Sequence, residues 1–127
     1  ATAIYHPQLR KIIFGFNPNQ GRGWELPGGK QDGNETIIQA AAREVFEECG
    51  LRVDPIFVGY MDDGPTYCCM FFVAVSDELP RVMEPENHTQ WTWWSWQDPP
   101  APLNPFTSQL LHRFTWPAVA EKLGVLR

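Results

Sequence analysis

One stretch of this chain constrains its fold and its chemistry more than any other. It runs from Gly29 to Leu51 and reads GKQDGNETIIQAAAREVFEECGL. Its polar first part is rich in turn-forming residues and predicts a loop over residues 28–35. The remainder predicts a helix over residues 36–49, with Asn34 as the N-cap ahead of an acidic first turn. Gly50 suits the left-handed position that follows many helices.

The predicted helix has two contrasting faces. At 100° per residue, one face is an apolar stripe that we expect to pack on the core. The stripe consists of Ile38, Ala42, Val45, Phe46 and Cys49. Glu44, Glu47 and Glu48 lie on a nearly opposite face, where like charges three and four residues apart repel by about 0.2–0.5 kcal/mol per pair.

Two interpretations of these three carboxylates are open. One is a solvated acidic face, which is common on helices. The other is a site for Mg²⁺, because carboxylate oxygens are the hard ligands that this ion prefers and its charge would relieve the repulsion. The preceding Pro27-Gly28-Gly29 segment favours the second interpretation, since two of its residues lack a Cβ and let backbone carbonyls approach closely.

The spacing of the fixed residues in this stretch resembles the Nudix box. The matching positions are Gly29, Glu35, Arg43-Glu44-Val45, Glu47-Glu48 and Gly50-Leu51. With average residue usage, roughly one chain in ten million would meet these nine constraints by chance. The resemblance covers essentially the whole chain, because WELPGGK (24–30) and MEPENHTQWTWWSWQDPPAPL (83–103) are similar to segments of small eukaryotic-type Nudix nucleoside triphosphate pyrophosphohydrolases.

The resemblance implies an α+β fold, a Nudix-type α/β/α sandwich with a mixed β-sheet, in which the box helix packs between sheets. It also implies hydrolysis that depends on Mg²⁺, with Mn²⁺ as an alternative metal. Glu47 and Glu48 would ligate the metal together with the carbonyl of Gly28. Glu44 would be a further ligand or the general base, and both roles stay open.

Arg43 would support these ligands. Lying one turn before Glu47, it would pair with a neighbouring carboxylate and fix its rotamer, so we count Arg43, Glu44 and Glu47 as the catalytic candidates. Gly29 and Glu35 take supporting roles. For Glu35 that role is either in the outer sphere of the metal or a simple stabilisation of loop and helix.

One departure from the family pattern concerns the group that contacts phosphate. Relatives often carry Arg or Lys where the strand before the box ends, whereas this strand ends Phe16-Asn17. We therefore expect the phosphate contact to pass to Arg22 or Lys30, or to be absent.

A second departure lies in the later stretch, where Asn87 and Thr89 replace a Lys and a Glu of the family pattern. A loop carboxylate that serves as an extra metal ligand or base would then have to be Glu84 or Glu86.

Aromatic residues are numerous, with six Trp and eight Phe. A ring stacked on a nucleobase contributes about 1–3 kcal/mol, yet most aromatic residues at alternating strand positions belong to the core. Phe16 and Trp93 are the candidates for contact with substrate. His6, His88 and His112 are scattered, and we expect them at the surface.

The rest of the chain predicts strands followed by two helices. Strands are expected over residues 1–5 and 10–16, which form a hairpin, and then over 24–26, 53–61, 66–75 and 91–96. Residues 62–65 join the strand 53–61 to the strand 66–75, which is almost entirely apolar and should be central and buried on both faces. In 91–96 (WTWWSW), the first and third residues face one side and Trp94 and Trp96 the other.

Two irregular segments and two helices complete the chain. Residues 76–90 predict a long polar loop and residues 97–105 a Pro-rich one. A helix over 106–114 would have Asn104 as its cap and Pro105 at its first position, and a second helix from about 116 to 123 would end at Gly124.

Composition predicts a single globular domain over residues 1–127. A net charge of −5 and a pI of about 5.1 argue against a nucleic-acid partner. No apolar run or leader suggests a membrane span or a signal peptide. Cys49, Cys68 and Cys69 have no metal-ligand spacing and suggest reduced thiols in a cytoplasmic protein, with Cys49 in the helix core and the other two on opposite faces of a strand. A homodimer is compatible with the sequence.

These observations predict a Mg²⁺-dependent Nudix pyrophosphohydrolase. The substrate we expect is a nucleoside triphosphate, unmodified or oxidised, cleaved to monophosphate and pyrophosphate. Two alternatives stay open: a nucleotide sugar, dinucleotide or isoprenyl diphosphate as substrate, or a nucleotide-binding module without turnover. The full set of box carboxylates argues against the second alternative.

Overall fold

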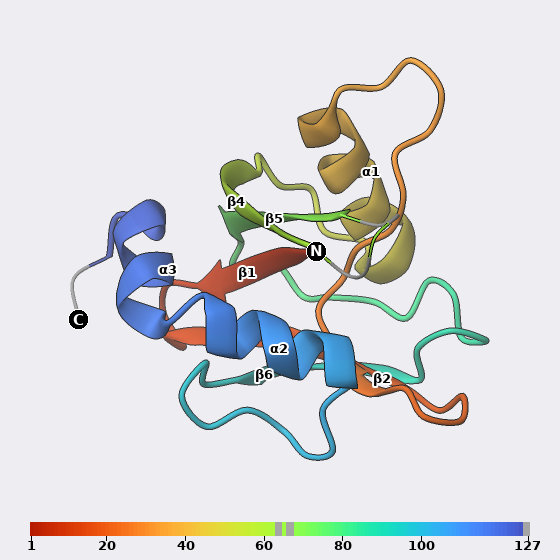
Figure 1. Cartoon of the computed structure of the whole chain (residues 1–127). Coiled ribbons are helices and arrows are strands. Elements are labelled where there is room, and N and C mark those ends of the chain that lie inside the picture. Colours follow the sequence, from red (N-terminus) through yellow and green to blue (C-terminus); the bar gives the residue numbers. More distant parts are fainter. Residues whose placement is uncertain (63–64, 66–67, 126–127) are drawn as a thin grey trace.

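A computed structural model of the chain describes residues 1–62, 65 and 68–125 (Figure 1). In these residues one mixed sheet contains β1 (Thr2–His6), β2 (Lys11–Asn17), β3 (Gly23–Glu25), β4 (Ile56–Asp62), β5 (Cys68–Val75) and β6 (Gln90–Trp94). The helices are α1 (Ile37–Cys49), α2 (Pro105–Arg113) and α3 (Trp116–Leu123).

The sheet runs in the order β3-β2-β1-β5-β4, and β6 pairs with β2. The predicted hairpin is present, because β1 and β2 are antiparallel neighbours. β1 also pairs in parallel with β5, from Thr2 opposite Phe72 to Tyr5 opposite Val75. One parallel pair among antiparallel ones makes the sheet mixed, as predicted.

Helices cover both faces of this sheet, as Figure 1 shows. Alternate residues of the first two strands separate the two sides: Ile4 and Ile13 pack with Val45 of α1, whereas Phe14 packs with Leu110 of α2 and with α3. The α/β/α sandwich is therefore confirmed. The expectation that the box helix lies between two sheets is wrong for the described residues, because their strands all join one sheet and α1 covers one of its faces.

The box helix begins later than the sequence predicted. Its N-cap is Thr36 and not Asn34, because the Thr36 side chain accepts from the backbone N–H of Gln39 while the Gln39 side chain accepts from that of Thr36. This capping box places Glu35 before the helix and leaves no acidic residue in its first turn. Gly50 ends the helix in the left-handed conformation, with φ of 73°, as predicted.

The buried face of α1 is rotated from the predicted stripe. Val45 and Cys49 are fully buried, but Ile38 is 47% exposed, and Glu48 is buried instead. The physical reason is the Pro27-Gly28-Gly29 segment, which packs against the acidic side of the helix: the Gly28 N–H donates to Glu48 Oε1 at 3.3 Å. Ala42 and Phe46 of the predicted stripe are only half-buried.

Within the described residues, two strand boundaries differ from prediction by more than one residue. β4 begins at Ile56 and not at Val53, since Pro55 has no N–H to donate to a neighbouring strand. β6 ends at Trp94 because a bridge between Ser95 and Asp98 turns the chain. Trp96 still packs in the core on the predicted side and donates from Nε1 to the Phe114 carbonyl at 3.0 Å.

β5 is an interior strand between β1 and β4, and residues 71–74 are buried on both faces as predicted. Its expected first residues, Thr66 and Tyr67, and Asp63 and Gly64 of the preceding turn lie outside the described residues. Cys69 is buried and Cys68 exposed, which confirms their opposite faces, and Cys49 is buried in the helix core. None of these three thiols forms a disulfide.

The C-terminal helices follow prediction closely. The Asn104 side chain caps α2 by accepting from the N–H groups of Phe106 and Thr107 at 2.8 and 3.2 Å. Gly124 ends α3 in the left-handed conformation, with φ of 75°. No helix within the described residues has the length and apolarity that a membrane crossing requires.

Candidate active site

Arg43 is the centre of an ion-pair network on α1. Its Nε and Nη2 atoms donate to the two carboxylate oxygens of Glu35 at 2.6 and 2.9 Å. Its Nη1 atom donates to Glu44 at 3.1 Å and to Glu47 at 3.0 Å. Nη2 also reaches the carbonyl of Lys30 at 2.9 Å. The network joins the loop before the helix to its acidic face, and the Glu35 contacts raise the pKa of the Arg43 guanidinium.

The loop residues fit closely against the carboxylates of α1. A Cβ at Gly29 would overlap the carboxylate of Glu44, so no other residue fits there without moving that side chain. Gly28 donates its N–H to Glu48 and lies against the backbone of Ala1. The two glycines therefore allow this segment to pass directly beside Glu44 and Glu48, which agrees with the close approach that the sequence suggested.

Burial makes the charges of Glu44 and Glu48 costly. Glu48 is only 7% exposed, and burial raises its pKa to about 8, with further contributions from Glu44, Glu84 and Glu25. Burial and a contact with Glu47 also raise the pKa of Glu44, against the opposing effect of Arg43. Negative charge on this side of the helix is thus incompletely compensated by the protein itself.

A divalent cation fits this arrangement chemically. Glu44, Glu47, Glu48 and the carbonyl of Gly28 are hard oxygen donors beside a segment without side chains. A cation would stabilise the ionised forms of Glu44 and Glu48, which burial and neighbouring carboxylates disfavour. Within residues 1–62, 65 and 68–125, however, no three acidic, His or Cys side chains already stand in the arrangement of a metal site. Two of the carboxylates point to Arg43 instead.

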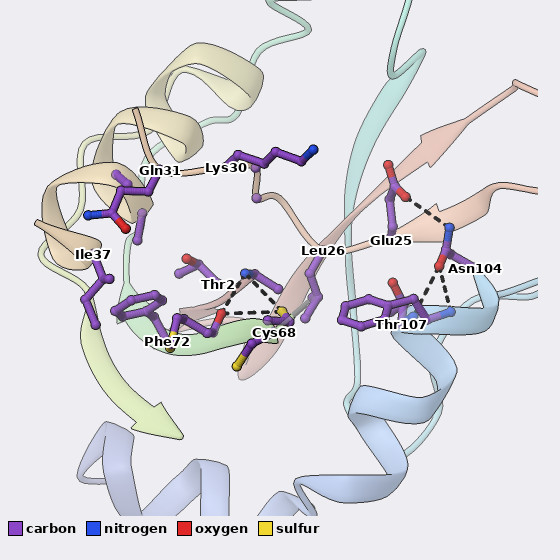
Figure 2. Close-up of a pocket in the computed structure, with 18 of the residues that line it drawn as sticks. Thr2, Glu25, Leu26, Lys30, Gln31, Ile37, Cys68, Phe72, Asn104 and Thr107 are labelled. Atoms are coloured by element: carbon purple, nitrogen blue, oxygen red, sulfur yellow. Dashed lines mark hydrogen bonds between the residues drawn. The ribbon is translucent and has the colours of Figure 1, made fainter. Parts of the chain in front are cut away.

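A pocket of about 680 Å³ opens beside the two glycines (Figure 2). One wall comes from α1, with Ile37 and Ala41, and another from β5, with Cys68 and Phe72. Leu26 lies between these walls and the N-terminal end of α2, where Figure 2 shows Thr107 and Asn104 next to Glu25. The pocket thus combines apolar walls with one polar end, which suits a flat aromatic group carrying charged substituents.

The structure brings two of the four predicted substrate-binding residues to this pocket. Arg22 and Lys30 both line it. Phe16 and Trp93 do not: the Phe16 ring packs on Trp24 at 5.3 Å, and Trp93 packs against His6 and the α1 side of the core. Among the described residues, the aromatic side chains that line the pocket are Phe72 and Phe106.

The sequence did not predict the polar cluster around Glu25 at the end of the pocket. Glu25 is buried, and its Oε1 accepts from Arg22 at 2.9 Å and from Asn104 at 3.3 Å. Its Oε2 accepts from Asn17 at 3.2 Å and lies 2.7 Å from His88 Nε2. Burial acts to raise the pKa of Glu25, but these contacts prevail and lower it. The one sequence signal was WELPGGK, which places an acidic residue inside a strand.

His88 corrects another expectation. It was predicted at the surface, but it is 6% exposed, and its ring stacks near Trp91 at 4.5 Å. The loop that carries it is tied to α1, because the Arg81 N–H donates to the Cys49 carbonyl at 2.8 Å and the Met83 N–H to the Glu48 carbonyl at 3.4 Å. His6 is half-buried, and His112 is exposed as predicted.

The same loop distinguishes the two candidate carboxylates within it. Glu84 is near enough to Glu48 to raise its pKa, and its own carbonyl accepts from the N–H groups of Asn87 and His88. Glu86 is exposed. Of the pair, the structure therefore places Glu84 beside the acidic face of α1.

Solved structures of known proteins share this fold. A MutT NUDIX hydrolase from Burkholderia pseudomallei matches with a TM-score of 0.70 and 27% identity over 90% of this chain and 95% of that one. A C. elegans Ap4A hydrolase in a binary complex matches with a TM-score of 0.69 over 90% of this chain and 92% of that one. Its 17% identity supports the likeness of fold alone.

Curated relatives match shorter segments. An 8-oxo-dGDP phosphatase of Homo sapiens is 38% identical over 52 residues, which are 40% of this chain and 16% of that protein. An octanoyltransferase of Myxococcus xanthus is 31% identical over 81 residues, which are 64% of this chain and 20% of that protein. The matched segments thus span a fifth or less of these two proteins.

The family comparison covers most of the chain. The NUDIX domain model matches residues 11–114, from the start of β2 to just beyond the end of α2. That range contains the box helix, the glycine segment and most of the residues that line the pocket. With this match, and with MutT hydrolases among the structures of the same fold, the chain belongs to the Nudix hydrolase family.

Proposed function

We propose that this protein is a Mg²⁺-dependent pyrophosphohydrolase that cleaves a nucleoside triphosphate, unmodified or oxidised, to monophosphate and pyrophosphate. The observation that carries the proposal is the position of the pocket. Its apolar walls and polar end adjoin the Gly28-Gly29 segment, and the other side of that segment contacts Glu44 and Glu48. A nucleoside in the pocket would extend its phosphates toward the carboxylates.

Each part of the site has a distinct task in this proposal. Glu44, Glu47, Glu48 and the Gly28 carbonyl would hold the metal, which supplies neutralisation of phosphate charge and activation of the attacking water. Arg43 holds Glu35, Glu44 and Glu47 together through its N–H groups, which gathers the ligand side chains at one place on α1. Glu44 and Glu47 would turn from Arg43 to bind the metal. Glu44 is a ligand or the general base.

Arg22 and Lys30 would bind the charged part of the substrate. Both line the pocket, and they supply positive charge in a protein whose net charge is −5. Phe72 and Phe106 lie on the walls, where a base would stack. Because the base and the phosphates would be held at opposite ends, position decides which phosphorus is attacked.

Hydrolysis in ¹⁸O-water tests this proposal. The purified protein is incubated with Mg²⁺ and a panel of nucleoside triphosphates, nucleoside diphosphates, nucleotide sugars, dinucleotides and prenyl diphosphates, and the label is located by mass spectrometry. We expect monophosphate and intact pyrophosphate from a triphosphate, with the label on one product only. Orthophosphate as the first product, or turnover of another class alone, would contradict the substrate assignment. A protein that binds nucleotide without any turnover would be a binding module.

A further inference from the structure

Glu25 joins four segments that are distant in the sequence. Its donors come from the end of β2 (Asn17), the turn before β3 (Arg22), the loop before β6 (His88) and the cap of α2 (Asn104). Each carboxylate oxygen has two partners, so this buried acid is fully hydrogen-bonded. The carboxylate is therefore fixed at the polar end of the pocket, where Figure 2 shows it beside Asn104.

Asn17 is the last residue of β2, where the resemblance to the Nudix family led us to expect a basic residue. Here its side-chain N–H group donates to Glu25 Oε2 at 3.2 Å, and its oxygen accepts from the backbone of Asn19 at 3.0 Å. Asn17 is also buried, at 7% exposure. It supplies no positive charge to a substrate, so that charge must come from a residue that lines the pocket.

Arg22 lines the pocket, and its side chain is more exposed than that of Asn17. Its side chain is 52% exposed, and its Nη2 atom donates to Glu25 Oε1 at 2.9 Å. Among the described contacts this bond uses one of the five N–H donors of the guanidinium, and the others are available to an anion. An exposed Arg ordinarily loses side-chain entropy when it binds a ligand, and an anchor of fixed position reduces that loss.

We propose that Glu25 is a positioning residue for substrate binding: it holds the Arg22 guanidinium at the pocket, where Arg22 takes an anionic group of the substrate in place of a basic residue at position 17. The inference rests on the proposed function, because it assumes a phosphate-bearing substrate in this pocket. Glu25 itself contacts no reacting atom in this scheme. Its loss therefore weakens binding and leaves the chemical step nearly unchanged.

A double-mutant cycle between Glu25 and Arg22 tests the proposal. Binding of α,β-methylene-dGTP in Mg²⁺ is measured by calorimetry, and kcat and KM are measured with dGTP, for wild type, E25Q, R22A and the double variant. A hydrogen bond to a charged group typically accounts for about a tenfold change in affinity or more. We expect each single variant to raise Kd and KM about tenfold, with kcat within about twofold of wild type.

The Kd of the double variant distinguishes an effect of Glu25 through Arg22 from a merely structural role of Glu25. If Glu25 acts through Arg22, the double variant binds about as weakly as R22A alone. If the two losses multiply to about a hundredfold, Glu25 does not act through Arg22 and the proposal is wrong. The control variant is E121Q, which makes the same substitution at an exposed Glu on α3, and its Kd, KM and kcat should equal those of wild type.

Two further measurements keep the outcome readable. If E25Q does not fold, E25D takes its place. The shorter Asp side chain keeps a charge for the buried donors but moves it away from Arg22, so Kd should rise about threefold. An unchanged Kd in folded E25D would overturn the proposal. A wild-type protein that neither binds the analogue nor hydrolyses any nucleoside triphosphate of the panel described above overturns the proposed function and this inference together. Normal wild-type behaviour with normal binding by E25Q overturns only the inference.

Discussion

Two clusters of residues in this molecule contain buried Glu side chains, and the pKa values of these side chains shift in opposite directions. On α1, Glu44 and Glu48 lie close to each other and to Glu84, and burial raises their pKa values. At the end of the pocket, Glu25 is surrounded by donors and its pKa is lowered. In the first cluster the protein disfavours the ionised carboxylates and compensates their charge only in part, whereas the second is satisfied within the protein. We infer that the first is built to receive a cation and the second to hold other residues in place.

Metal removal should produce the largest effect and would sharpen this contrast. The proposed site on α1 depends on an added cation, so hydrolysis should vanish in EDTA and return with Mg²⁺ or Mn²⁺. Thermal unfolding followed in parallel should show a rise in Tm on adding metal, because a ligand that binds only the folded state stabilises it. Undiminished turnover in the chelator would show that the α1 cluster does not act through a metal.

Glu48→Gln should produce the next largest effect. The change keeps the size of the side chain but removes a charged oxygen, and kcat should fall at least about a hundredfold if a principal metal contact is lost. The metal-free variant should unfold at the same or higher Tm than wild type, since burial no longer opposes a charge at this position. A fall of less than about threefold with unchanged metal affinity would exclude Glu48 as a ligand.

The two clusters also differ in how well a sequence reveals them. The acidic face of α1 arises within a single helix, where spacing alone places Glu44, Glu47 and Glu48 together. The Glu25 cluster arises from residues 17, 22, 25, 88 and 104, which only the folded sheet and the α2 cap bring together. Sequence reasoning therefore named Arg22, which lines the pocket, but not Glu25, and it placed buried His88 at the surface.

The same limit applies to the fold. Local signals such as Gly50, Asn104 and Gly124 correctly marked helix ends, because caps depend on neighbouring residues alone. The burial of α1 was predicted less well, because the loop that packs against it lies outside the helix and shifts the buried face toward Glu48. Long-range packing, not helix periodicity, decided that result.

A pair of cap substitutions should have moderate effects that separate the two regions. Thr36 caps α1 and Asn104 caps α2, so changing either to Ala should cost about 1 kcal/mol of unfolding free energy. Asn104 also donates to Glu25, and Thr36 does not contact that cluster. N104A should therefore raise KM by a few-fold beyond T36A at matched fraction folded, measured by urea unfolding and steady-state kinetics. Equal KM values in the two variants would show that Asn104 does not contribute to substrate binding through Glu25.

The smallest expected effect is a pH dependence that belongs to Glu25 alone. Burial opposes the charge of Glu25, but its contacts with His88, Asn17 and Arg22 lower its pKa in the folded protein below the ordinary value of 4.5. Between the lowered value and 4.5 the unfolded chain binds more protons, so this contribution is present above about pH 4.5 and is lost as pH falls through the folded pKa.

E25Q lacks the group, so the difference in unfolding free energy between wild type and E25Q should stay constant from pH 7 to pH 5 and narrow below pH 4.5. Taking this difference removes the titration of the carboxylates that do not interact with Glu25. Glu48 does interact with it, but the pKa of Glu48 is raised to about 8, so that coupling acts above the acid range in which the difference should narrow. Urea unfolding of the two proteins at intervals between pH 3.5 and pH 7 measures it, and a difference that widens in acid would mean that the donors around Glu25 do not stabilise its charge.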